Sequence, residues 1–179
     1  VDTTGRVFAV FPQVDGYAFL SGNIEVTEAE RRFTWALRLV DKLHRHDIVL
    51  GDLCPASFWV ERAGELRCIG IMGSFDSDAG ATAMVPPMET LPYSAPEQRS
   101  GGAPMPASDV FALGVLGYQL FTKQLPFGAS PAAAHDLGRV KPISAFVNIP
   151  PVWAEEVILK CLAMEPGERF LSAGEVLQA

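Results

Sequence analysis

The sequence lacks the features that mark zinc-binding, secreted and membrane-spanning proteins. It has only three cysteines, which lie far apart and form no CxxC pair, so we expect neither a zinc site nor a disulfide framework. No signal-peptide pattern is present, and the longest apolar stretch, 110–121, is too short to cross a membrane. We therefore expect no direct membrane insertion, no cofactor and a cytoplasmic location, either alone or as the cytoplasmic part of a larger or membrane-tethered protein.

Positive charge is also scarce. Lysine and arginine number 14 against 21 acidic residues, which gives a formal net charge of −7. Such a balance disfavours nucleic acid as a partner. The 179 residues are 49% hydrophobic, enough for one domain with a real core. Because the chain starts with Val1 instead of methionine, we expect it to be part of a longer polypeptide.

Periodic patterns predict several helices. Apolar residues recur at helical intervals over 27–46, and Thr27 and Glu30 have the spacing of a capping box. The stretch 109–122 is apolar almost all round, which is typical of a buried central helix. An amphipathic helix is predicted over 151–166, and a short final helix after Ser172.

Short apolar runs predict strands. One strand is expected over 5–11, and two more, over 57–60 and 66–71, are expected to pair as a hairpin. The segment 73–90, rich in Gly, Ala, Ser, Asp and Pro, reads as a long loop.

The order of motifs carries a resemblance. "VLGDLCPASFWV" (49–60) is followed by "TLPYSAPEQ" (90–98), "SDVFALGVLGYQLF" (108–121) and "CLAMEPGERF" (161–170). In this order they resemble the C-terminal lobe of bacterial Hanks-type serine/threonine protein kinases. The resemblance implies an α+β, mostly α fold, in which a helical base carries a short β-hairpin and the N-lobe is largely absent. Residues 1–22 would be the last N-lobe strand and hinge, and 23–179 the C-lobe.

The resemblance also implies roles for single residues, and several chemical positions differ from the family pattern. Asp52 matches the catalytic-loop aspartate, but Cys54 stands where the family has lysine and Ser57 where it has a magnesium-binding asparagine. The Asp-Phe-Gly triplet falls on Gly70, Ile71 and Met72 or, shifted by one to keep a glycine, on Ile71, Met72 and Gly73. Neither frame has an aspartate. No GxGxxG loop or strand lysine of the nucleotide clamp occurs.

The structural positions fit the family better. Glu97 and Arg169 match its buried glutamate–arginine pair, and Asp109 matches the aspartate that binds the catalytic-loop backbone. Thr90 matches the threonine that contacts the catalytic aspartate. Three further hydroxyls, in or beside the long loop, are candidates for phosphorylation: Ser74, Ser77 and Thr82.

From these matches the sequence predicts a catalytically inactive pseudokinase, not an enzyme, that acts as an interaction, scaffold or regulatory module. Its expected partners are proteins, either subunits of a larger assembly or an upstream domain of the same polypeptide. Two alternatives stay open. One is a nucleotide or small-ligand sensor without catalysis, and the other is an atypical active serine/threonine kinase with Asp52 as the base.

Overall fold

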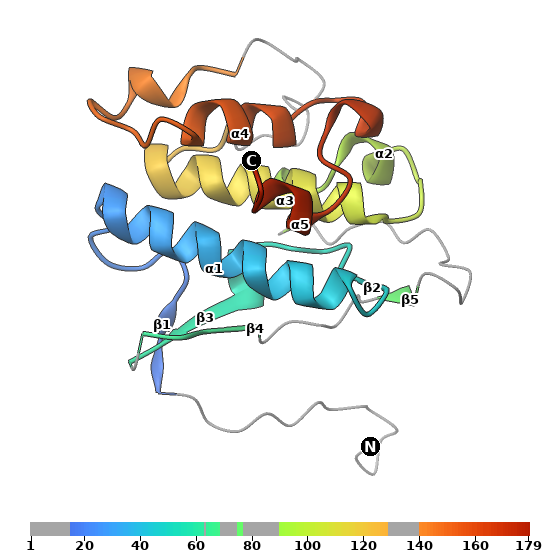
Figure 1. Ribbon diagram of the computed structural model, residues 1–179, viewed down its shortest axis with the longest axis horizontal. Helices are drawn as coiled ribbons and strands as arrows, with labels where there is room; N and C mark the ends of the chain where they lie inside the picture. Colours follow the sequence, from blue (N-terminus) through green and yellow to red (C-terminus); the bar gives the residue numbers. More distant parts are fainter. Residues whose placement is uncertain (1–14, 63, 69–74, 77–89, 129–139) are drawn as a thin grey trace.

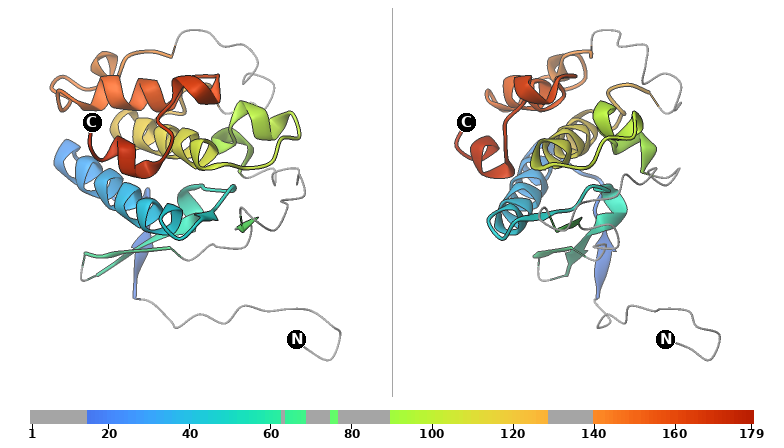
Figure 2. Two further views of the ribbon diagram at one scale, coloured as in Figure 1. Left: turned by 45° about the vertical axis from the view of Figure 1, so that its right-hand side comes forward. Right: turned by 90° about the vertical axis from the view of Figure 1, so that its right-hand side faces the viewer.

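Three helices and a small sheet form the body of the protein. The computed structural model describes residues 15–62, 64–68, 75–76, 90–128 and 140–179. The helices are α1 (Val26–His44), α3 (Pro106–Thr122) and α4 (Ala154–Cys161). Helix α3 lies between α1 and α4, and the sheet lies on the side of α1 that faces away from α3 (Figure 1). The rotated views show the same stacking (Figure 2). The predicted fold class, mostly α with a short β-hairpin, is confirmed.

Helix α1 follows its apolar periodicity. Phe33, Leu37 and Val40 lie on its buried face, which packs against α3. The predicted capping box is wrong, because the helix starts at Val26 and no side chain caps its N-terminus. In the first turn, Glu28 instead forms ion pairs with two arginines of the next turn.

Helix α3 is the centre of the core. All of its residues except Pro106 and Gln119 are buried, as the apolar run predicts. Close packing explains its glycines: a Cβ at Gly117 would lie 2.7 Å from the ring of Phe33 on α1. The helix begins three residues before the predicted start and ends where Lys123 adopts the left-handed conformation, with φ of 61°.

The sheet is antiparallel, in the order β1 (Gly16–Ala18), β3 (Phe58–Glu61) and β4 (Leu66–Cys68). The predicted hairpin is therefore confirmed over its described part, and its predicted end at 69–71 lies outside the described residues. Phe58 and Val60 belong to the hydrophobic core. Elsewhere, β2 (Ile48–Val49) pairs with β5 (Phe75–Asp76).

Short elements complete the chain. They are η1 (Pro55–Ser57), η2 (Leu91–Tyr93), α2 (Pro96–Arg99), η4 (Ile143–Ala145), η5 (Pro166–Glu168) and α5 (Ala173–Val176). The final helix is confirmed, with Ser172 accepting a hydrogen bond from the Glu175 amide. The amphipathic helix is shorter than predicted, since α4 covers only Ala154–Cys161. In the part of the chain that the structure describes, no helix is long and apolar enough to cross a membrane. The predicted strand over 5–11 lies outside the described residues.

Candidate functional site

The backbone before Asp52 is fixed by side chains from two helices. The Asp109 carboxylate, in the first turn of α3, accepts hydrogen bonds from Leu50 N at 2.8 Å and Gly51 N at 2.7 Å. The Gln98 side chain, on α2, donates to the Gly51 carbonyl at 2.5 Å. Gly51 itself has φ of 75°, a conformation that favours glycine and that a larger side chain would strain. The loop is thus held in one conformation on both sides of the Gly51 peptide.

His44 adds a further contact beneath this loop. Its Nε2 lies 3.0 Å from Oδ2 of Asp109, and the side chains of both residues are almost completely buried. Its Nδ1 is 3.4 Å from the amide of Ala173 at the start of α5. Because Nδ1 accepts from that amide, Nε2 is the nitrogen that donates to Asp109. The loop, α1, α3 and α5 therefore meet at one buried carboxylate.

Asp52 projects from this supported loop. Its Oδ1 is enclosed and accepts no hydrogen bond from any residue that the structure describes. Burial raises the pKa of its carboxyl group, and the nearby charge of Asp109 raises it further. A buried acceptor without a partner is unfavourable by roughly 1–3 kcal/mol. Asp52 therefore keeps an acceptor atom that no residue in the described part of the chain uses.

Cys54 and Ser57 form a closed turn next to Asp52. The Ser57 hydroxyl accepts a hydrogen bond from Cys54 N at 3.1 Å, and Cys54 Sγ lies 3.8 Å from the same oxygen. Ser57 is only 4% exposed. Its hydroxyl therefore stabilises η1 from within and is not presented to the solvent.

The fold family implies magnesium, which prefers oxygen ligands in near-octahedral geometry. Among the residues that the structure describes, no three His, Cys, Asp or Glu side chains come close enough together to hold a metal ion. The residues at the two family ligand positions are Ser57, whose hydroxyl is used in η1, and Gly70 or Ile71, which lie outside the described residues. The described residues do not fit magnesium.

The segment 90–99 packs against α3 through η2. Thr90 is buried, and its carbonyl accepts hydrogen bonds from the amides of Tyr93 and Ser94. Tyr93 donates its hydroxyl to Gln119 on α3 at 2.7 Å, and burial together with the proximity of Cys54 raises its pKa to about 12. Arg99 donates to the Leu91 carbonyl at 2.5 Å. The contact between Thr90 and Asp52 that the resemblance implies stays a prediction.

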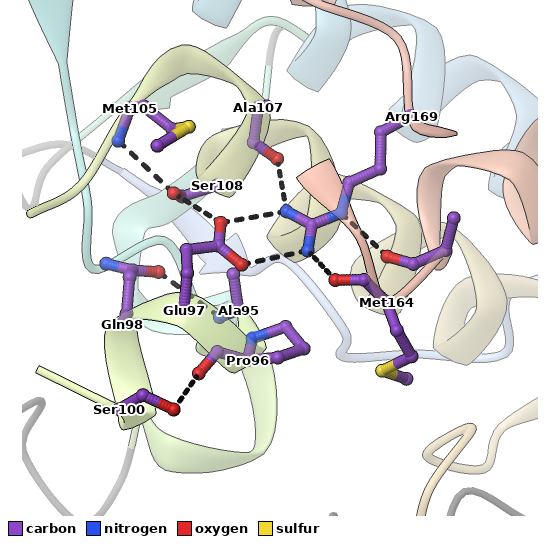
Figure 3. Close-up of polar contacts among 11 residues, drawn as sticks. Ala95, Pro96, Glu97, Gln98, Ser100, Met105, Ala107, Ser108, Met164 and Arg169 are labelled. Atoms are coloured by element: carbon purple, nitrogen blue, oxygen red, sulfur yellow. Dashed lines mark hydrogen bonds and ion pairs between the residues drawn. The ribbon is translucent and has the colours of Figure 1, made fainter. Parts of the chain in front are cut away.

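Glu97 and Arg169 come together across 72 residues of sequence. Both guanidinium Nη atoms lie 2.9 Å from the Glu97 carboxylate, in a two-point ion pair (Figure 3). Arg169 also donates to the carbonyls of Ala107, Ala163 and Met164, so all five of its N–H groups are used. The pair joins α2 to the segment between α4 and α5.

Glu97 should make stability depend on pH. Burial opposes its ionisation, but hydrogen bonds from Arg169, its own amide and Ser108 outweigh this effect and lower its pKa. A lowered folded-state pKa stabilises the fold above the ordinary glutamate pKa of about 4.3, and this stabilisation is lost as the pH falls through the folded value. We expect the difference in unfolding free energy between wild type and Glu97→Gln to be constant from pH 7 to 5 and to shrink below that, in urea denaturation. A difference that stays the same down to pH 3 would contradict this pKa shift.

Five of the residues singled out from the sequence cannot be placed. They lie outside the described residues and are Gly70, Ile71, Ser74, Ser77 and Thr82. Sequence reasoning also missed two residues that support the site. Gln98 and His44 lie 47 and 65 residues from the groups they bind, so no local spacing points to them.

The chain is similar to bacterial kinases over most of its length. No protein-family description matches it. It is 33% identical to a probable serine/threonine-protein kinase of Streptomyces coelicolor over 98% of the chain. It is 28% identical to the kinase PknJ of Mycobacterium tuberculosis over 98% of the chain, and 34% identical to the kinase Pkn1 of Myxococcus xanthus over 72%. The chain covers only 28%, 32% and 20% of these three relatives, respectively.

These relatives overturn one prediction. The sequence predicted a protein that is not an enzyme, but the relatives are named as serine/threonine kinases and nothing in the comparisons points to a non-enzyme. The physical reason is that the prediction weighed single positions, above all the missing aspartate at Gly70 and Ile71, in a chain that covers less than a third of these relatives. Asp52 and the contacts that hold its loop are present. The chain is thus a homologue of part of the bacterial serine/threonine protein kinases.

Proposed function

We propose that this chain is the substrate-binding lobe of a serine/threonine kinase domain and that Asp52 accepts a hydrogen bond from the hydroxyl to be phosphorylated. The observation that carries the proposal is the enclosed Oδ1 of Asp52, for which no described residue supplies a donor. The kinase relatives supply the reaction class. In this reaction class most of the catalytic effect comes from positioning and electrostatic stabilisation. A fixed acceptor for the substrate hydroxyl is therefore a central part of the catalytic site.

Each contact around Asp52 serves this role. Asp109 and Gln98 fix the backbone that leads into Asp52, so the carboxylate is presented at one position. A raised pKa makes the Asp52 carboxylate a better proton acceptor than an ordinary surface aspartate.

The experiment is phosphate transfer from labelled ATP by the full-length protein. Asp52→Asn keeps the size of the side chain but removes its basicity, so we expect the rate to fall at least about 100-fold. Asp15→Asn is the matched control, because Asp15 is exposed and pairs with the exposed Arg62. An Asp52→Asn protein that transfers phosphate at the wild-type rate would refute the assignment. So would a full-length wild-type protein that transfers none.

Protein binding is a second function that we propose for the same lobe, inside the cytoplasm. One observation favours it: a groove on the outer side of α1 combines an aromatic ring with basic side chains.

A further inference from the structure

A groove runs between α1 and the β3–β4 hairpin. It has a volume of about 450 Å³, and the hairpin lies beneath α1 in the view of Figure 1. Four of its lining residues lie on one stripe of α1: Trp35, Arg38, Leu39 and Lys42. Glu65 and Leu66 line it from the hairpin. The opposite face of α1 packs against α3, so this stripe is the outer side of the helix.

Trp35 in this groove is not part of the hydrophobic core. It is partly exposed, whereas Leu39 and Leu66 beside it pack against core residues. Its ring is held on two sides: the Arg31 guanidinium lies 4.7 Å from the ring centroid, and the hairpin turn at Gly64 lies against it. A large aromatic ring that is held rigidly, but not used by the core, is typical of a binding anchor.

The basic residues of the groove are not neutralised. Arg38 and Lys42 are exposed, and neither forms an ion pair with any residue that the structure describes. Other arginines on α1 differ in this respect, since Arg31 and Arg32 pair with Glu28. The groove therefore has two free positive charges and one negative charge, Glu65, in a chain with a net charge of −7.

We propose that this groove docks an acidic peptide segment of a partner protein. One apolar side chain of the peptide packs against Trp35 and Leu39, and its carboxylates bind Arg38 and Lys42. The charge complementarity selects an acidic ligand, and the aromatic ring provides the apolar contact. The inference rests on the proposed protein-binding function and is independent of phosphate transfer by Asp52.

The test uses the full-length protein and a fluorescein-labelled dodecapeptide in which two central leucines are flanked by glutamates and aspartates. Binding is followed by fluorescence anisotropy at low salt. We expect Arg38→Glu combined with Lys42→Glu to weaken binding at least about tenfold, and binding to weaken as salt is raised. Trp35→Ala should also weaken it at least about tenfold. Glu65→Gln should strengthen it, because it removes the repulsion between Glu65 and the peptide.

Matched controls separate docking from net charge and from catalysis. Arg62→Glu with Lys141→Glu makes the same charge change outside the groove and should leave affinity within about twofold of wild type. Asp52→Asn should also leave it unchanged, so failure of docking and failure of catalysis are distinguishable. The proposal is overturned if the groove and control variants weaken binding equally, if a lysine-containing peptide binds as well, or if a 12-nucleotide single-stranded DNA competes at equal affinity.

Discussion

Replacing Arg169 with alanine should destabilise the protein by about 3–5 kcal/mol, because it leaves a buried charge without its partner. The Arg169 side chain has no exposed surface. Its two Nη atoms each donate a hydrogen bond of 2.9 Å to one oxygen of the Glu97 carboxylate. Its loss would also remove the donors from three backbone carbonyls and the packing of the guanidinium against the ring of Phe111, now 4.9 Å away. The effect combines electrostatics with unsatisfied polar groups.

Urea denaturation of Arg169→Ala and of a matched surface variant measures this effect. Arg62→Ala removes an ion pair with Asp15 in which both side chains are at least 75% exposed, and it should cost less than about 1 kcal/mol. The destabilisation caused by Arg169→Lys should lie between those of Arg169→Ala and Arg62→Ala. A lysine keeps the positive charge but has too few N–H donors for all of the acceptors that Arg169 binds. If Arg169→Ala were no more destabilising than Arg62→Ala, the ion pair would not join α2 to the C-terminal segment in solution.

The helices could be predicted from the sequence because their signals are local. The burial of α3 follows from an apolar run, and the inner face of α1 follows from the spacing of Phe33, Leu37 and Val40. The start of α1 was mispredicted by a local rule. Thr27 has the spacing of a cap, but the structure starts the helix at Val26, where Glu28 binds two arginines.

The candidate site could be predicted only in part, because it depends on contacts between distant segments. The resemblance pointed to Glu97 and Arg169, whose positions 72 residues apart carry no spacing signal. No local spacing points to the contact between His44 and Asp109 on α3. Ser57 stands where the family has a magnesium-binding asparagine, and only the structure shows its hydroxyl bound to Cys54 N. Tertiary packing decides which of its possible partners a short polar side chain binds.

Asp109→Ala should destabilise the protein by about 2–6 kcal/mol, because it removes the acceptor of two backbone N–H groups in the loop before Asp52. Leu50 N and Gly51 N would each lose a charge-assisted hydrogen bond, and each unsatisfied donor is unfavourable by roughly 1–3 kcal/mol. Asp109→Asn should cost less, since its carbonyl oxygen can still accept one of the two hydrogen bonds. Urea denaturation of both variants measures the difference.

The Asp109→Asn variant also tests the electrostatic coupling between Asp109 and Asp52. The charge of Asp109 contributes to the raised pKa of Asp52, after burial, so removing it should lower that pKa. NMR titration of the Asp52 carboxyl carbon in Asp109→Asn measures this shift, and the isosteric change keeps burial nearly constant. If Asp109 only supported the backbone, the pKa of Asp52 would stay unchanged while stability fell. A lower pKa would show that the carboxylate that holds the loop also sets the basicity of the group the loop presents.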